Sequence, residues 1–138
     1  MRFKNILVPF DNSVISKRAL NKAIVLANLT DAKITLVHVI SYPKTIAKIV
    51  GPYKGTMVAY VKKFMDEVKK YSTRENVMVE TQILYGNSAE EILKLMGKKK
   101  FELVVMGKRG TTKIIGPSLG SVSNNLVQRS KVPVLVVT

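Results

Sequence analysis

The chain has 138 residues, of which 46% are hydrophobic, and it contains no cysteine. The hydrophobic content excludes a mainly disordered protein, and the lack of thiols excludes disulfides, thiol catalysis and zinc thiolate sites. The formal net charge of +14 favours a polyanionic partner (a nucleotide, a nucleic acid or an anionic lipid), although solubility or adaptation to heat or salt would explain it equally well.

The chain opens with a predicted strand, a helix and a second strand. Residues 4–10 and 33–40 are short apolar runs bounded by turn residues, which is typical of strands buried on both faces of a sheet. Residues 14–29 repeat apolar side chains at helical spacing. Asp11 and the two residues that follow it are all good N-cap types, so this helix begins directly after the turn.

The middle of the chain predicts a loop, a helix and a strand. Residues 41–55 contain prolines and glycines and indicate a loop, with one helical turn around residues 46–50. Residues 56–72 carry an apolar stripe that suits an amphipathic helix, and residues 76–86 alternate apolar with more polar side chains as a strand does.

The last third predicts two further helices and two strands. Ser88 is the expected cap of a helix over residues 89–97, whose first turn carries two glutamates where the helix dipole favours anions. Residues 101–106 and 132–138 indicate strands, and residues 121–130 a helix.

Strands that alternate with helices and are buried on both faces predict a parallel sheet covered by helices on each side. Five strands and four helices fill the chain, so we expect an α/β fold in one domain over residues 1–138. The apolar part of the N-terminus is too short for a signal peptide, and no apolar run approaches the ~20 residues that cross a bilayer. We therefore expect a cytoplasmic protein that does not enter a membrane.

Residues 106–123, MGKRGTTKIIGPSLGSVS, hold four of the eight glycines and directly follow a buried strand. A loop between a parallel strand and a helix is a common anion site, because the helix start supplies unpaired N–H groups and partial positive charge. Gly120 stands where the last helix should begin. The N–H groups of Ser121, Val122 and Ser123, with the two serine hydroxyls, are therefore candidate phosphate ligands.

The glycine spacing does not fit two common phosphate motifs. Neither the P-loop pattern G-x-x-x-x-G-K-[ST] nor the dinucleotide pattern G-x-G-x-x-G is present. The chain instead has G-x-x-G, nine residues and then G-S, on Gly107, Gly110, Gly120 and Ser121. From spacing alone, a glycine-rich connection without a ligand is the alternative.

This segment resembles the ATP-binding signature of the universal stress protein family, G-2x-G-9x-G-[ST]. Residues 6–20 are similar to the family's opening strand and helix, residues 36–40 to its second strand, and residues 131–137 to its last. The resemblance covers almost the whole chain. It implies a Rossmann-like, adenine nucleotide alpha hydrolase-like fold with strand order 3-2-1-4-5.

The resemblance also implies a nucleotide between the carboxyl ends of the first and fourth strands. Asp11 and the backbone near Pro9 and Val39 would meet adenine and ribose, and the glycine segment would hold ribose and phosphates. Asp11 has capping of the first helix as its alternative role. The side chains of Lys108, Arg109 and Lys113 would either contact the phosphates or point to solvent. The full expected set is Pro9, Asp11, Val39, Met106, Gly107, Lys108, Arg109, Gly110, Thr111, Thr112, Lys113, Gly120, Ser121, Val122 and Ser123.

The expected ligand is ATP, with Mg²⁺ or Mn²⁺ but no assigned metal ligand. We expect a nucleotide-dependent regulatory module with little or no hydrolysis, because no residue is placed to orient water and no second carboxylate is available for a metal. A slow Mg-dependent ATP hydrolase on the same fold is the alternative. A nucleic-acid binder ranks lower, since no RNA-reading aromatic motif accompanies the basic residues.

We also state expectations for the single histidine and for the last strand. His38, the only histidine, lies within an apolar strand and is expected to be a hydrogen-bonded structural residue. An apolar last strand at a sheet edge invites pairing with another chain. Family members often dimerise through this strand, so the resemblance implies a homodimer formed through Val132–Thr138.

Overall fold

The computed structural model describes residues 3–41, 46–110 and 118–138. Within these ranges the chain forms a parallel five-stranded sheet in the order β3-β2-β1-β4-β5, which confirms the predicted order 3-2-1-4-5. The strands are β1 (Asn5–Pro9), β2 (Lys33–Ile40), β3 (Val79–Tyr85), β4 (Leu103–Gly107) and β5 (Val134–Val137).

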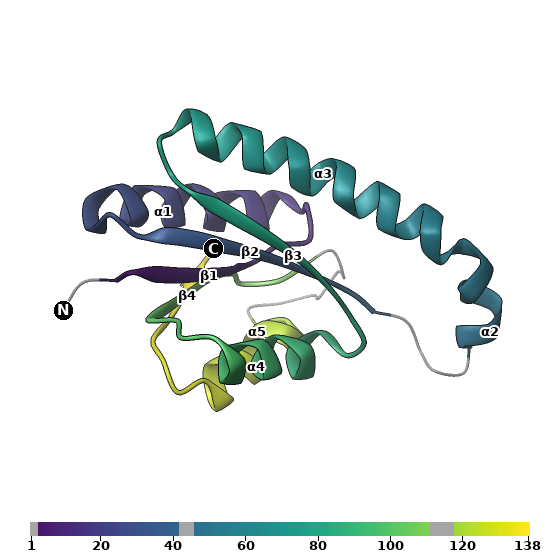
Figure 1. Ribbon diagram of the computed structural model, residues 1–138. Helices are drawn as coiled ribbons and strands as arrows, with labels where there is room; N and C mark the ends of the chain where they lie inside the picture. The colour runs from purple at the N-terminus through teal and green to yellow at the C-terminus, as the bar shows by residue number, and fades with distance from the viewer. Residues whose placement is uncertain (1–2, 42–45, 111–117) are drawn as a thin grey trace.

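Helices cover both faces of the sheet in a Rossmann-like arrangement (Figure 1). On one face lie α1 (Val14–Thr30) and α3 (Lys54–Arg74), and on the other lie α4 (Ser88–Lys98) and α5 (Ser121–Arg129). The short helix α2 (Ala47–Val50) and a 3-10 turn lead into α3. None of the helices in the described ranges is long and apolar enough to cross a bilayer.

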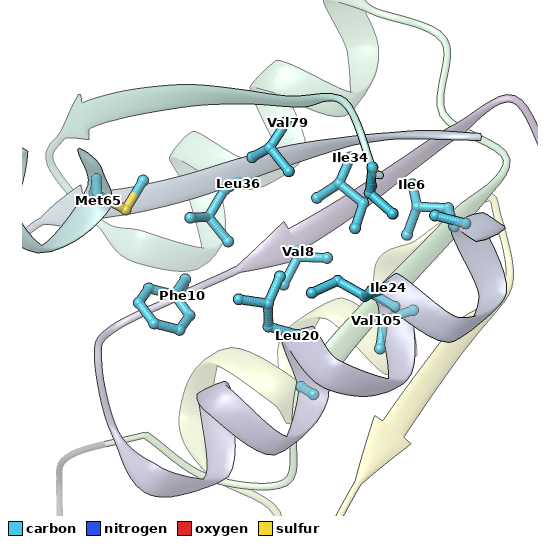
Figure 2. Close-up of a cluster of buried hydrophobic side chains, with 14 of the residues drawn as sticks. Ile6, Val8, Phe10, Leu20, Ile24, Ile34, Leu36, Met65, Val79 and Val105 are labelled. Carbon is cyan, nitrogen blue, oxygen red and sulfur yellow. The ribbon is translucent and has the colours of Figure 1, made fainter. Parts of the chain in front are cut away.

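The core forms two apolar layers because successive strand residues point to opposite faces of the sheet. Ile6, Val8 and Phe10 of β1 and its exit pack toward α1 and α3, as Figure 2 shows, whereas Leu7 packs in the layer beneath α4 and α5. This alternation matters for function, because it decides which helices face each side chain at the end of a strand.

Helix α3 begins earlier than predicted, at Lys54, inside the region predicted as a loop over 41–55. Gly55 therefore lies in its first turn, where a glycine costs only about 1 kcal/mol relative to alanine. The longer helix extends the wall of the sheet's α1/α3 side toward the carboxyl ends of the strands (Figure 1).

Side-chain caps fix the starts of two helices. Ser13 Oγ accepts from Ser16 N at 3.1 Å and caps α1, so Asp11 is not the helix cap. Asn87 Oδ1 accepts from Glu90 N at 3.0 Å and caps α4, so the prediction of Ser88 as the cap was wrong by one residue.

Candidate functional site

A cavity of about 770 Å³ lies at the carboxyl edge of the sheet, within the size range usual for ligand sites. Its lining comes from the ends of β1, β2 and β4, from the start of α5, and from α3 and α4. Strands β1 and β4 are neighbours in the sheet although β2 and β3 lie between them in the sequence, and β1 pairs on its other side with β2. The chain order reverses between them, and open α/β sheets bind ligands at such a switch point.

The exit of β1 brings a carboxylate to this cavity. Asp11 Oδ1 accepts from Ser13 N at 3.0 Å, which fixes the turn into α1, and Asn12 has a positive φ of 66°. Asp11 Oδ2 lies 2.5 Å from the place where a Cβ on Gly110 would stand. Glycine at 110 therefore allows the loop after β4 to approach the Asp11 carboxylate closely.

The exit of β4 is held by backbone hydrogen bonds. Lys108 N donates to Val137 O at 2.7 Å, and the Lys108 carbonyl accepts from Gly120 N at 3.0 Å. The same carbonyl accepts from Ser123 Oγ at 2.6 Å, and Ser123 is only 2% exposed. The Ser123 hydroxyl thus joins α5 to the loop after β4, which directs its proton toward the protein.

The start of α5 supplies main-chain donors. Gly120 is its N-cap and gives no side-chain hydrogen bond, and the first intrahelical bond runs from Asn124 N to Gly120 O at 2.9 Å. The N–H groups of Ser121, Val122 and Ser123 precede that bond, so they have no acceptor within the helix. All three residues line the cavity, which therefore receives the positive end of the α5 dipole.

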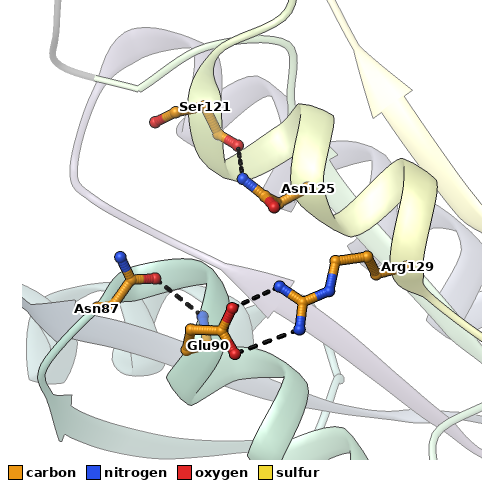
Figure 3. Close-up of polar contacts among 5 residues, drawn as sticks. All are labelled: Asn87, Glu90, Ser121, Asn125 and Arg129. Carbon is orange, nitrogen blue, oxygen red and sulfur yellow. Dashed lines mark hydrogen bonds and ion pairs between the residues drawn. The ribbon is translucent and has the colours of Figure 1, made fainter.

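Helix α5 is also tied to α4 by an ion pair (Figure 3). Arg129 donates through both terminal nitrogens to the Glu90 carboxylate, with Nη2 and Oε2 3.2 Å apart. This hydrogen bond lowers the pKa of Glu90 below its ordinary value and raises the pKa of Arg129. The pair therefore joins the first turn of α4, which Asn87 caps, to the last residue of α5.

Most of the predicted residues meet at the cavity. Lys108 is not among the lining residues, and Thr111, Thr112 and Lys113 lie outside the described residues. The predicted residues that line the cavity are Pro9, Asp11, Val39, Met106, Gly107, Arg109, Gly110, Gly120, Ser121, Val122 and Ser123.

Sequence reasoning missed a further part of the lining, which comes from α3 and the residues that face it. Phe10, His38, Tyr60 and Phe64 all line the cavity. His38 Nδ1 lies 2.8 Å from Phe10 O, so the expected hydrogen bond is present. The apolar stripe of residues 56–72 was a usable signal, but local spacing does not show which strand ends a helix will cover.

Acidic side chains are scarce at this site. Asp11 is the one carboxylate among the described lining residues. In the part of the chain that the structure describes, no three histidine, aspartate or glutamate side chains gather as a metal ion would require.

Comparisons with known proteins agree with this fold. The model of the universal stress protein family matches residues 2–138. Universal stress protein MJ0531 of Methanocaldococcus jannaschii is 32% identical, over 98% of this chain and 82% of its own length.

Two solved structures extend the likeness. MJ0577 of the same organism superposes with a TM-score of 0.90 at 29% identity, covering 99% of this chain and 96% of its own. A universal stress protein in complex with cAMP superposes with a TM-score of 0.72 at 25% identity, covering 99% and 97%. The chain therefore belongs to the universal stress protein family.

Proposed function

We propose that this protein binds an adenine nucleotide, ATP in the first instance, in the cavity between β1 and β4, and that it acts as a nucleotide-dependent regulatory module. One observation carries the proposal: the three N–H groups that open α5, without a side-chain cap, face a cavity of ligand size. A family member solved with cAMP supports an adenine nucleotide as the ligand class.

The residues present fit such a ligand. The amides of Ser121, Val122 and Ser123 would hold phosphate oxygens, and each hydrogen bond to a charged oxygen contributes about 1.5–3 kcal/mol. The summed free energy of three such bonds is comparable with the roughly −8 kcal/mol that micromolar binding requires. The cost of ordering the ligand and the loop reduces this sum. Arg109 would add positive charge, and the Asp11 carboxylate would accept from ribose hydroxyls.

The base would lie on the apolar side of the cavity. Val39, Met106 and Val122 pack in the layer beneath α4 and α5, and Pro9 lines the same cavity. Apolar walls with a few polar groups at one end are the usual composition of a nucleotide or cofactor site. The assignment of Thr111, Thr112 and Lys113 to the phosphates rests on the family resemblance alone.

We expect little or no hydrolysis. Asp11 is the single carboxylate in the described lining, and efficient phosphoryl transfer requires a firmly held metal and a positioned water. Mg²⁺ or Mn²⁺ would therefore accompany ATP through the phosphates, without an assigned protein ligand. Steady-state phosphate release separates the two functions: many turnovers per minute, abolished in Asp11→Ala, would identify a hydrolase.

Calorimetric titration of ATP into wild type, Gly120→Val and Gly97→Val tests the site. A Cβ at Gly120 would stand 3.3 Å from Arg109 Cα, a tight contact that a small shift of the loop relieves, so the fold should persist while the branched side chain enters the phosphate cradle. ATP binding should disappear in Gly120→Val. Gly97 lies in α4 with open space around it, so its variant is the matched control and should bind normally. Unchanged ATP affinity in a folded Gly120→Val protein would show that the site is misplaced.

A further inference from the structure

The cavity has a second side that the proposed nucleotide site does not use. Side chains alternate along β2, so Val39 packs in the α4/α5 layer whereas Ile40 packs in the α1/α3 layer, and His38 points the same way as Ile40. The lining residues on this α1/α3 side are Phe10, His38, Ile40, Met57, Tyr60, Val61 and Phe64. None of them belongs to the residue set expected for a nucleotide.

We call the part lined by Phe10, His38, Met57, Tyr60 and Phe64 the aromatic lobe. Three of its rings surround Phe64. The His38 and Tyr60 rings meet it edge to face, with centroid distances of 5.3 and 5.6 Å, and Phe10 lies at 6.1 Å. Edge-to-face contacts hold rings in fixed orientations, so the wall of the lobe is preorganised. Met57 adds an adaptable apolar side chain.

His38 gives the lobe a defined polar group. Its Nδ1 lies 2.8 Å from the carbonyl oxygen of Phe10, and a carbonyl can only accept. Nδ1 must therefore carry the proton. In the neutral ring, Nε2 is then a hydrogen-bond acceptor on the opposite edge of the imidazole.

We infer that the aromatic lobe binds a small planar aromatic molecule that carries a ring-bound N–H donor, with that donor directed to His38 Nε2. The aromatic walls supply contact area and edge-to-face partners, and the acceptor selects ligands with a donor over isosteric ligands without one. Because the lobe lies on the opposite side of the strand ends from Val39 and Met106, this site goes beyond the nucleotide proposal and does not depend on it.

A matched ligand pair tests the inference on the wild-type chain. Indole has an N–H donor, and benzothiophene has nearly the same shape without one. In saturation-transfer NMR titrations, indole should bind saturably and about tenfold more tightly than benzothiophene, the difference expected for one hydrogen bond. Equal affinities, or no saturable binding of millimolar indole, would overturn the inference.

Two variants locate the site. Asn places an amide nitrogen as far from Cβ as Nδ1 is in histidine, so His38→Asn keeps a donor for Phe10 O and removes Nε2. Indole affinity should fall to that of benzothiophene in this variant, and an undiminished affinity would refute the role of His38. Tyr60 is 67% exposed, so Tyr60→Ala should leave the fold intact and weaken both ligands. Gly120→Val should bind indole normally, which separates failure of this site from failure of the nucleotide site.

Discussion

Gly107 and Gly120 belong to one motif, but the structure requires them for different reasons. A Cβ on Gly107 would stand 2.5 Å from Ile15 Cγ2 and 3.3 Å from the Ile15 carbonyl carbon, at the start of α1. Gly120 has an ordinary extended backbone, φ −66° and ψ 165°, and the nearest atom to its Cβ position is 3.3 Å away. A Cβ on Gly107 would thus overlap the Ile15 side chain, whereas a Cβ on Gly120 would make a tight contact that a small shift relieves.

We predict that Gly107→Ala lowers the free energy of unfolding by about 1–3 kcal/mol, as overpacking of a close contact does. The β-branched Ile15 side chain has little rotamer freedom in a helix and cannot easily move away. Urea denaturation of Gly107→Ala and Gly120→Ala measures the difference, and the second variant should unfold close to wild type. Equal midpoints for the two variants would show that the contact at Ile15 relaxes without cost.

At the scale of elements, the ion pair between Glu90 and Arg129 links α4 to α5. Both side chains are about half exposed, so its contribution to stability is small. Hydrogen bonding to Arg129 lowers the pKa of Glu90 in the folded state below its ordinary value of 4.5. The folded state therefore binds that proton less readily than the unfolded state, and the pair stabilises the fold above the ordinary pKa.

We predict a pH-dependent cost for Glu90→Gln. Its unfolding midpoint should lie slightly below that of wild type at pH 7, and the difference should shrink as pH falls below 4.5 and through the lowered pKa of Glu90. Added salt at pH 7 should also reduce it. Glu67→Gln removes one exposed carboxylate from α3 and serves as the control. A difference that persists at low pH would mean that Glu90 acts through something other than its charge.

The sequence predicted the type of every strand and of the four long helices, because short apolar runs bounded by turn residues, or alternation in residues 76–86, indicate strands, and an apolar period of 3.6 indicates a helix face. Element ends were harder to predict. In the structure Ser13 and Asn87 cap α1 and α4, although their neighbours Asp11 and Ser88 are residue types that suit a cap equally well. The backbone geometry of the turn decides which residue becomes the cap. The early start of α3 was missed because Gly55 resembles a loop residue.

The candidate site also has a part that the sequence predicted and a part that it did not. Its backbone donors were predicted because the glycine spacing of a loop is local in sequence. The aromatic lobe was not, since it combines residues far apart in the chain, such as Phe10 and Phe64, through packing across the sheet. The strand order itself came from family resemblance, because alternating strands and helices are compatible with several orders.

For the whole molecule, the net charge of +14 leaves a nucleic-acid role to be tested. We predict weak binding of duplex DNA at 150 mM salt, because the charge is spread along the chain and supports only nonspecific contacts with phosphates. Fluorescence anisotropy across a salt series measures it. Submicromolar affinity that persists at 150 mM salt would favour a nucleic-acid partner over the nucleotide proposal.

Among the strands that the structure describes, β5 lies at an edge of the sheet, and its chemistry favours pairing with a second copy of the chain. The Pro133 carbonyl accepts from Val104 N of β4 and the Val137 carbonyl from Lys108 N just after it, so the backbone groups of Val134 and Val136 point outward by alternation. The strand carries no charged residue that would prevent pairing. Leu135 remains 41% exposed on this edge strand.

We therefore predict a homodimer in which two β5 edges pair antiparallel about a twofold axis, which satisfies the outward backbone groups of both chains. Sedimentation velocity at micromolar concentration should show a dimer for wild type. Leu135→Lys places one charge per chain at the shared edge, where the two copies repel each other, so it should shift the protein to monomer. Leu29→Lys adds the same charge at a residue of α1 that is 77% exposed, and it should remain dimeric. A wild-type monomer, or a dimer that Leu135→Lys leaves intact, would show that β5 is not the interface.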